Sequence, residues 1–291
     1  MIDIVFNIVD DVLNSDIKIV TIDWEKVENL IKQMKKDGPQ TFPILFDKKT
    51  GIYIEILKEI VANSINYCYW YGAHDIRPNG ISSTKMYEHV EQVFNYTQNH
   101  ALNFESRIDS IIELLSMNRY PLLDERKRHL WDLCEGRKAE VFANDILKNS
   151  EQSGEFLFRK MVKLFHGYAS DIFLKRASLF FIQLHRKYGW YNNDDNDLMS
   201  ILPVPSDYQV PKVLRHFGCI IYTPSLEEDI YESKLIPKHS LAEIQIRAAT
   251  IKVCETLRKR LNWTIADIDT YLWCKKKITD IPFHCTITTD Y

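Results

Sequence analysis

Apolar residues recur at intervals of three and four along most of the chain, which is the spacing of helices that bury one face. The clearest case is residues 23–37, where Asp23 supplies a capping residue and Gly38 and Pro39 end the pattern. The same spacing predicts further helices over residues 53–62, 84–95, 107–115, 124–147, 155–165, 171–188, 210–217, 241–261 and 264–276. We therefore predict a mainly α-helical protein.

Strand patterns are short and few. Residues 16–22 alternate around Ile17 and Ile19, and residues 285–289 are rich in β-branched side chains that favour strand pairing. We expect a small β element at most.

The chain shows no internal repeat and no low-complexity linker, so we expect residues 1–291 to form a single domain. The polar run at residues 192–197 predicts an exposed loop. If the chain has a seam between sub-domains, we expect it near residues 190–203.

Charged side chains nearly balance, with 37 Lys and Arg against 40 Asp and Glu and a formal net charge of −3. A protein that grips many phosphates usually carries a clear basic excess, so we expect no nucleic-acid duplex as a partner. Residues 1–9 are apolar but contain Asp3 and Asn7 and lack a basic stretch, which argues against a secretory signal. No stretch is long enough to span a bilayer, and we expect a cytoplasmic protein without a membrane partner.

Common cofactor and catalytic motifs are missing. None of the nine glycines forms a G-x-G pattern, which argues against dinucleotide-binding and phosphate-loop folds. The G-x-S-x-G and H-E-x-x-H patterns are also missing. The six cysteines show no spacing that fits tetrahedral zinc and are expected to be reduced thiols. We therefore expect no metal and no cofactor, so that any chemistry must come from dispersed residues.

Ser206 and Asp207 stand where the proline-bounded residues 202–205 run into a predicted short helix. The simplest interpretation is a helix N-cap. A catalytic interpretation is compatible with it, because the amide dipoles at a helix start favour an ionised carboxylate. Cleavage of a glycosidic bond needs such a fixed negative charge, since its transition state has oxocarbenium character. Asp207 is therefore a candidate catalytic carboxylate.

Two further clusters admit a structural and a functional interpretation. Lys175 and Arg176 would normally be solvated cations on the predicted helix at residues 171–188. Residues 66–72 are unusually rich in aromatic side chains, which suits core packing or a stacking platform for a planar base.

The last third of the chain adds four candidates. Arg247 lies in an amphipathic stretch at residues 243–249, where it could pair with a carboxylate across a groove or form a structural ion pair. Asp269 and Trp273 are four residues apart and so face the same side of a helix. An Asp there could hydrogen-bond the amino-pyrimidine edge of a base while the Trp stacks on it, although a capping or ion-paired Asp is commoner. His284 lacks the partners that a metal site needs.

In their order and spacing, these segments resemble the queuosine salvage family, the queuosine 5′-phosphate N-glycosylase or hydrolase proteins. The resemblance runs through most of the chain and is clearest at residues 65–70, 120–126, 173–177, 206–218, 243–248, 269–273 and 281–284. It implies an α-rich fold similar to helix-hairpin-helix DNA glycosylases that acts on a free nucleotide instead of a duplex. It also implies hydrolysis of queuosine 5′-monophosphate, which releases queuine, a 7-deazaguanine base, for salvage into tRNA.

The resemblance also implies roles for the candidate residues. Asp207 would be the catalytic carboxylate, and Lys175 would lie in the active site near the phosphate or the attacking water. Substrate-binding roles fall to Asn66, Tyr69, Trp70, Ser206, Tyr208, Arg247, Asp269, Trp273 and His284.

Departures from the family pattern bear on the substrate. Pro205 stands two residues before Asp207, where the family carries an aromatic side chain. Cys274 and residues 284–287 replace an Asp and a basic tail, and a histidine expected before Asn66 is missing. Because these changes concern binding more than catalysis, two alternatives stay open. The first is a glycosidase of another modified 7-deazapurine nucleotide, and the second is a non-catalytic nucleobase-binding protein.

Overall fold

The computed structural model describes residues 1–40, 51–72, 75–76, 80–98, 103–148, 153–190, 198–277 and 280–291. The prediction of a mainly α-helical protein with a small β element is confirmed. The α-helices are α1 (Ile2–Leu13), α2 (Trp24–Asp37), α3 (Ile52–Ser64), α4 (Ser83–Gln98), α5 (Phe104–Met117), α6 (Leu123–Cys134), α7 (Lys138–Leu147), α8 (Gly154–Leu164), α9 (His166–Ala169), α10 (Lys175–Tyr188), α11 (Leu198–Ile201), α12 (Gln209–His216), α13 (Pro224–Tyr231), α14 (Leu241–Leu261) and α15 (Ile265–Cys274). The strands are β1 (Val20–Ile22), β2 (Trp70–Gly72), β3 (Asp75–Ile76) and β4 (Ile220–Tyr222), and short 3-10 turns lie at Glu135–Arg137 and Lys275–Lys277.

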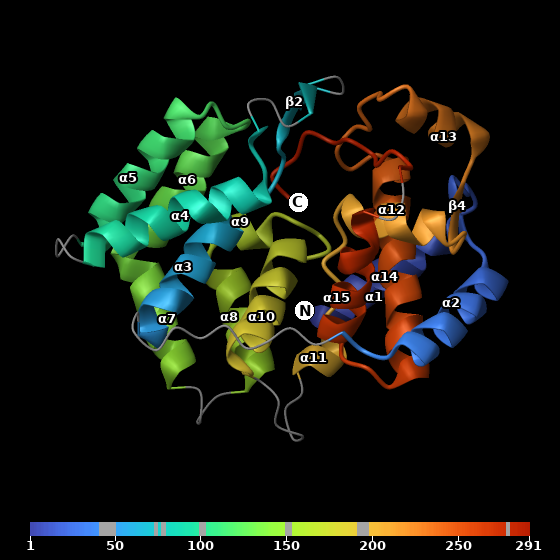
Figure 1. Ribbon diagram of the computed structural model, residues 1–291, viewed down its shortest axis with the longest axis horizontal. Coiled ribbons are helices and arrows are strands. Elements are labelled where there is room, and N and C mark those ends of the chain that lie inside the picture. The colour runs from blue at the N-terminus through green and yellow to red at the C-terminus, as the bar shows by residue number, and fades with distance from the viewer. Residues whose placement is uncertain are drawn as a thin grey trace.

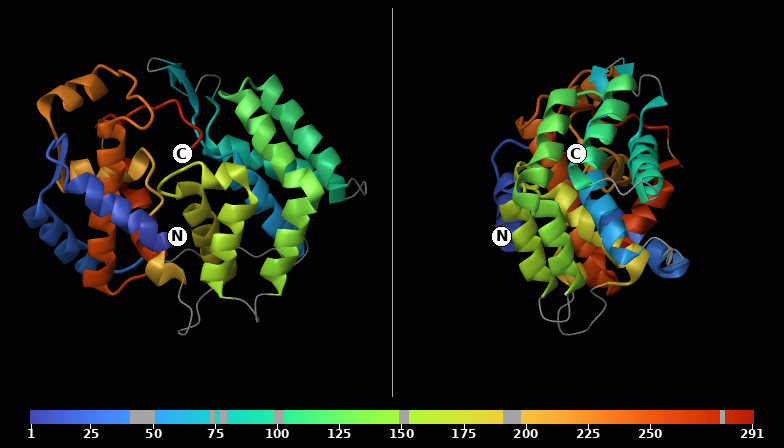
Figure 2. Two further views of the ribbon diagram at one scale, coloured as in Figure 1. Left: turned by 180° about the vertical axis from the view of Figure 1, so that it is seen from behind. Right: turned by 90° about the vertical axis from the view of Figure 1, so that its left-hand side faces the viewer.

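The helices form two groups with α10 between them (Figure 1). One group contains α3 to α9, and the other contains α1, α2 and α11 to α15. α10 packs against α3 and α8 of the first group and against α15 of the second. The long helix α14 is the centre of the second group, where it contacts α1, α2, α12 and α15 (Figure 2). The expected likeness to helix-hairpin-helix glycosylases stays a prediction.

Local sequence signals explain where the most regular helices begin and end. The Asp23 carboxylate accepts the amide of Lys26 at 3.1 Å, and α2 ends at Gly38, whose φ of 74° favours glycine. Ser240 caps α14 by accepting the amide of Glu243 at 3.3 Å. Both helices were expected from periodicity, and the bounds of α14 agree with its prediction at each end.

The single helix predicted over residues 124–147 is wrong, because the chain breaks there. Gly136 and Arg137 adopt left-handed φ values of 55° and 60° and divide the segment into α6, a 3-10 turn and α7. Two consecutive left-handed residues cannot continue a right-handed helix. Apolar periodicity on both sides of the break conceals it in the sequence.

The helix predicted over residues 171–188 begins four residues later than expected, at Lys175. The Asp171 carboxylate accepts the amides of Phe173 at 3.0 Å and Lys175 at 2.8 Å. Leu174 has a left-handed φ of 53°, so the first four residues form a turn instead of helix. The side-chain acceptors compete here with the helical backbone pattern.

Neither α1 nor α13 is among the predicted helices. α1 buries Ile2, Val5 and Val9 and packs on α14. α13 begins with Pro224, which suits the first helical position because proline lacks an amide donor. The loop predicted at residues 192–197, and with it the middle of the expected seam, lies outside the residues that the structure describes.

The β structure consists of two antiparallel pairs. β1 pairs with β4, with Val20 opposite Tyr222, and β2 pairs with β3. The strand expected within residues 16–22 is confirmed for its second half only. The prediction for residues 285–289 is wrong beyond Cys285, which forms an isolated bridge with Leu235.

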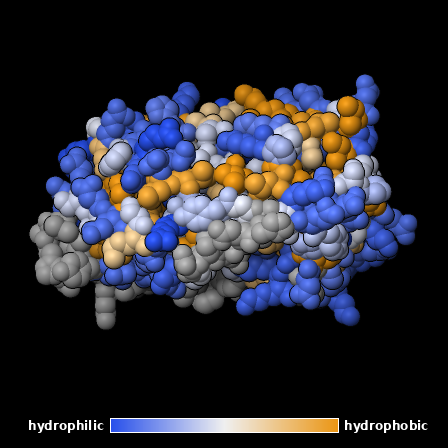
Figure 3. All heavy atoms as spheres, turned by 90° about the horizontal axis from the view of Figure 1, so that it is seen from above, coloured by the Kyte–Doolittle hydropathy of each residue, from blue (hydrophilic) through white to orange (hydrophobic). Residues whose placement is uncertain are grey.

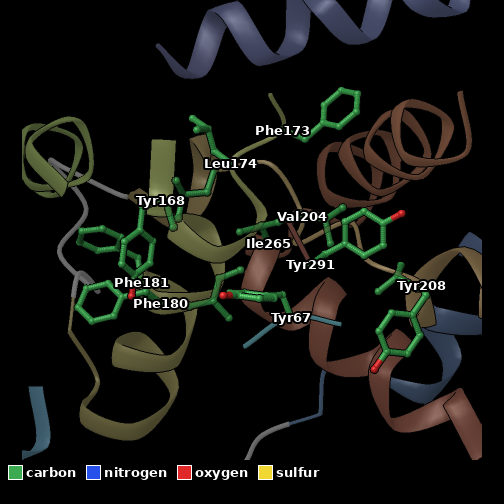
Figure 4. Close-up of a cluster of buried hydrophobic side chains, with 14 of the residues drawn as sticks. Tyr67, Tyr168, Phe173, Leu174, Phe180, Phe181, Val204, Tyr208, Ile265 and Tyr291 are labelled. Atoms are coloured by element: carbon green, nitrogen blue, oxygen red, sulfur yellow. The ribbon is translucent and has the colours of Figure 1, made fainter. Parts of the chain in front are cut away.

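A continuous hydrophobic core extends from Ile2 to Tyr291 and includes residues of both helix groups. Figure 4 shows side chains of α10, such as Phe180 and Phe181, in one cluster with Ile265 and Tyr291. Seen from above, the surface is largely hydrophilic with a band of apolar residues across it (Figure 3). Within the described ranges, no helix combines the length and the apolar character that crossing a bilayer requires.

Residues 284–291 lie between the two helix groups (Figure 1). The carbonyl of Tyr291 accepts the amide of Cys68 at 2.9 Å. The indole nitrogen of Trp70 donates to the carbonyl of Thr286 at 3.1 Å. This segment therefore joins the β2 region of the first group to the second group.

Gln245 fastens β1 to α14 through one fully buried amide. Its Oε1 accepts the amides of Ile19 at 2.8 Å and Val20 at 3.0 Å. Its Nε2 donates to the carbonyl of Ile17 at 2.6 Å and to the hydroxyl of Ser15 at 3.1 Å. All the donors and acceptors of the amide are thus in use.

Replacing Gln245 with Leu should lower the free energy of unfolding by about 2 to 4 kcal/mol, because buried backbone groups lose their only side-chain partner. Denaturant titration of the purified variant measures the loss. Gln33→Leu, at an exposed position of α2, is the control and should change stability by less than about 0.5 kcal/mol. Equal stability of the two variants would contradict the role of Gln245.

Candidate active site

A cavity of about 830 Å³ lies between the two helix groups along α10. Its walls come from α3, α4, α10, α12 and α15, together with the segment before α12 and the side chains of Phe283 and Tyr291. Cavities of about 300 to 1000 Å³ are typical of small-molecule sites. The cavity therefore has room for a ligand of nucleotide size.

Asp207 and Lys175 face each other in this cavity. The Lys175 ammonium lies 3.8 Å from the Asp207 Oδ2, and only 4% of Lys175 is exposed. The Asp207 Oδ1 accepts the amide of Gln209, the first residue of α12, at 2.7 Å. The prediction of a helix N-cap at Ser206 or Asp207 is wrong, because Tyr208 is the N-cap of α12, although Asp207 still binds an amide of the helix start. The catalytic interpretation of Asp207 stays a prediction.

The interpretation of Lys175 and Arg176 as solvated cations is wrong. Arg176 is 1% exposed, and its guanidinium donates to the carbonyls of Ser64 and Gly167. Burial lowers the pKa of Lys175 from its ordinary value, the Asp207 carboxylate opposes this shift, and the Arg176 charge reinforces it. A buried lysine beside a carboxylate is typical of catalytic sites.

Asp269 and Trp273 of α15 both line the cavity, as their spacing predicts. Arg186 of α10 donates to the Asp269 carboxylate at 2.6 Å. Burial raises the pKa of Asp269, and Arg186 opposes that rise. Trp273 is 44% exposed, and the Lys276 ammonium lies 3.1 Å from the centre of its ring. The Asp is thus ion-paired, while the indole stays accessible to a ligand.

Aromatic side chains form one wall of the cavity. Tyr208 and Phe283 have ring centroids 4.8 Å apart, and the Trp70 ring lies 5.0 Å behind Tyr208. Tyr208, Phe283 and Tyr69 line the cavity, whereas Trp70 is fully buried behind it. The Tyr69 hydroxyl donates to Asn66, another lining residue, at 2.7 Å. The aromatic residues within 66–72 therefore contribute both to the core, through Trp70, and to the cavity wall, through Tyr69.

Arg126 holds the Asn66 to Tyr69 part of this wall from behind. It is fully buried, and its guanidinium donates to the carbonyl of Cys68 at 2.7 Å and lies 4.4 Å from the Tyr67 ring centre. Burial raises the pKa of Tyr67 to about 12, and the Arg126 charge opposes that rise. A cation surrounded by carbonyls and aromatic faces fixes this irregular backbone.

Ser206, Arg247 and His284 do not line the cavity. The Ser206 hydroxyl donates to the carbonyl of Arg247 at 3.2 Å, and His284 Nε2 lies 3.2 Å from the Tyr291 hydroxyl. Burial lowers the pKa of His284 to about 3, so its imidazole is neutral at physiological pH. These three residues lie behind the wall that carries Asp207, and their expected contact with substrate stays a prediction.

Arg247 joins the two segments that carry Lys175 and Asp207. Its guanidinium donates to the Asp171 carboxylate at 2.7 Å and to the Ser206 carbonyl at 3.0 Å. The same Asp171 oxygen accepts the amide of Lys175. Burial alone would raise the pKa of Asp171, but the Arg247 charge and hydrogen bonds lower it below the ordinary value. This ion pair therefore fixes the position of the start of α10 relative to the segment that leads into α12.

Sequence reasoning missed Asp171, Gln183 and Phe283 as site residues. Asp171 has a usable signal, since an Asp four residues before Lys175 can accept amides of an incoming helix, and Phe283 lies within residues 281–284, which carry the family resemblance. Among the described residues, no three His, Cys, Asp or Glu side chains are grouped to hold a metal ion.

Comparisons with known proteins agree on one kind of relative. A family model described as queuosine salvage protein matches residues 59–291, which include every site residue predicted from the sequence. A curated relative from Sphaerobacter thermophilus, named queuosine 5′-phosphate N-glycosylase/hydrolase, is 27% identical over 262 residues, or 80% of this chain and 80% of the relative. A relative of the same name from Dictyostelium discoideum is 28% identical over 163 residues, or 50% of this chain and 51% of the relative.

Replacing Arg247 with Met should cost about 3 to 5 kcal/mol in the free energy of unfolding, because the Asp171 and Glu243 carboxylates stay buried without their cation. The Asp171→Asn/Arg247→Met double variant should lose less than the sum of its single variants. Arg260→Met is the control on the same helix, where an exposed pair with Glu28 contributes under about 1 kcal/mol.

The stability difference between wild type and Arg247→Met should also depend on pH. Because the folded pKa of Asp171 is lowered, its stabilisation is present above the unfolded value of about 3.9 and is lost as the pH falls through the folded pKa. Denaturant titrations at neutral and acidic pH should therefore show a shrinking difference. A difference that is constant with pH would show that Arg247 acts through packing alone.

Proposed function

Because this chain belongs to the queuosine salvage protein family, we propose that it is a hydrolase that cleaves the N-glycosidic bond of queuosine 5′-phosphate. The products are queuine and ribose 5-phosphate. The observation that carries this proposal is the buried Lys175 ammonium 3.8 Å from the Asp207 carboxylate in a cavity of nucleotide size. Residues 1–291 act as one unit, because both helix groups supply cavity walls.

Asp207 is the catalytic carboxylate in this proposal. Water forms a bond to C1′ of the ribose while the C1′–N bond breaks, and the electron pair of that bond leaves with the base. One proton of the water ends on the base nitrogen, and the hydroxyl stays on C1′. Positive charge develops on the sugar in between, and the Asp207 carboxylate stabilises it. The amide of Gln209 holds the carboxylate in place.

Lys175 acts beside this carboxylate at the reacting centre. Its buried ammonium orients Asp207 and the attacking water. The phosphate lies toward Lys212, Lys276 and Lys277, which line the cavity on α12 and the turn after α15. A dianionic phosphate is favoured near several ammonium groups.

The base stacks on the aromatic wall. Tyr208 and Phe283 offer ring faces to the cavity and supply the aromatic contact that Pro205 does not. Asn66, Tyr69, Asp269 and Trp273 bind substrate directly, and Trp70, Ser206, Arg247 and His284 support the wall from behind.

Incubating the protein with queuosine 5′-phosphate should release free queuine. Asp207→Asn should lower kcat by on the order of 10² or more, because the variant cannot offset the oxocarbenium charge. Asp124→Asn, at a side chain that is 86% exposed on α6, is the control and should keep full turnover. Chromatography of the products measures both.

The outcomes of this experiment separate the alternatives. Release of base from other 7-deazapurine nucleotides but not from queuosine 5′-phosphate would replace the proposed substrate. Binding of queuine without turnover of any nucleotide, unchanged by Asp207→Asn, would indicate a binding protein.

The activity should decline at alkaline pH. The pKa of Lys175 is lowered from 10.5 by burial, so an activity that needs its charge is lost as the pH rises through a value below 10.5. A profile of kcat/KM against pH measures this limb. Lys175→Arg keeps a cation to higher pH. The limb should therefore move upward in any activity that the variant retains, and an unmoved limb would assign it to another group.

A further inference from the structure

The cavity continues along α10 well beyond Lys175. Lys175, Leu179 and Gln183 follow at four-residue intervals and all line it. Gln183 is two turns past Lys175, or about 12 Å along the helix axis at about 1.5 Å per residue. Around Gln183 one wall comes from α3 and α4, while Arg186, one turn farther on, pairs with Asp269 of α15 on the other wall. We call the α3 and α4 side, lined by Glu55, Glu59, Tyr87, Glu91 and Gln183, the distal half.

The side-chain amide of Gln183 has a fixed orientation. Asn63 donates one Nδ2 proton to the Glu59 carbonyl at 2.9 Å, which fixes the orientation of the Asn63 amide. The same Nδ2 donates to the Gln183 Oε1 at 2.7 Å, and the Tyr87 hydroxyl donates to that oxygen at 2.8 Å. The Gln183 oxygen therefore accepts two protons and cannot exchange places with the nitrogen.

The Gln183 nitrogen is consequently the donor that remains for a ligand. Gln183 lines the cavity and is half-buried, and among the described residues no acceptor is bonded to its Nε2. An amide whose oxygen is already hydrogen-bonded and whose nitrogen is free to donate into a cavity is suited to recognise an oxygen of a ligand.

Charge distinguishes the distal half from the end near Asp207. Three carboxylates, from Glu55, Glu59 and Glu91, stand there against the ammonium groups of Lys58 and Lys187. Lys58 pairs with Glu55 at 2.8 Å, and Lys187 pairs with Glu59. The distal half therefore favours hydroxyl groups and cations over a phosphate.

The opposite side of the cavity, formed by α12, α15 and the segment with Asp207, has the opposite balance. Asp207 and Asp269 are its two carboxylates. Its five cations are Lys175, Arg186, Lys212, Lys276 and Lys277. A ligand with an anion on one side and a hydroxylated or cationic group on the other matches this polarity across the cavity.

We propose that the distal half is a subsite for the polar substituent on the base and that Gln183 is its specificity-determining residue. Queuine carries a hydroxylated cyclopentene ring on an aminomethyl arm, which offers hydroxyl groups and a protonated amine. Gln183 donates to a hydroxyl oxygen of this substituent, and the Glu59 and Glu91 carboxylates accept from its hydroxyl and amine protons. A nucleotide without the substituent leaves these groups unpaired in the cavity. This inference rests on the proposed hydrolysis of queuosine 5′-phosphate.

Kinetics with two substrates test the subsite. Queuosine 5′-phosphate carries the substituent, and 7-deazaguanosine 5′-phosphate lacks it. Gln183→Leu should lower kcat/KM for the first by about 10- to 100-fold, since a polar group of the substrate loses its partner, and change the second by less than about twofold. Gln33→Leu, on the exposed face of α2, should alter neither. Gln183→Met replaces the Leu variant if that protein does not fold.

Two outcomes would overturn the subsite: equal kcat/KM for both substrates in the wild type, or equal losses for both in the variant. Turnover of neither substrate would count against the proposed hydrolysis instead. In that case calorimetric binding of free queuine and 7-deazaguanine decides the subsite separately. The Gln183→Leu change must then weaken queuine by about tenfold or more and leave 7-deazaguanine unchanged, and any other result refutes the inference.

Discussion

The buried ion pair between Arg247 and Asp171 is the contact on which the geometry of the cavity depends. Neither charge has access to water, so each is tolerated only while the other stays in hydrogen-bonding position. That requirement fixes α14 against the turn that starts α10. Because the same guanidinium holds the carbonyl of Ser206, the segment leading to Asp207 is fixed as well. The separation of Lys175 and Asp207 is therefore determined in the core, outside the cavity that contains them.

The sequence predicts which segments are helical far better than it predicts where neighbouring helices begin and end. Apolar periodicity locates α2 and α14 correctly because each has one continuous buried face and ordinary caps. It misplaces the start of α10, since the Asp171 side chain and the left-handed Leu174 replace the first helical turn. Conformations of single residues such as Gly136 leave no trace in a pattern of apolar positions.

The candidate site divides in the same way. From its own neighbours Asp207 looks first like a helix cap, and both Asp207 and Lys175 stand out only through the family resemblance; the structure brings the two side chains together. The burial of Lys175 cannot be read from its neighbours in sequence, because it results from the packing of α10 against α15. Gln183 is equally hidden, since its fixed amide depends on Asn63 and Tyr87 from two other helices.

The segment between the two helix groups has a consequence for the order of folding. The amide of Cys68 and the carbonyl of Tyr291 are bonded across more than two hundred residues of chain. Closing so long a loop is entropically costly, and such contacts form after the local helical ones. Tyr291 also lines the cavity, so helical structure can be largely complete before this wall exists. The cavity that would bind a nucleotide is thus completed late in folding. Circular dichroism measures helix content, so its signal would reach the native value before the cavity is complete.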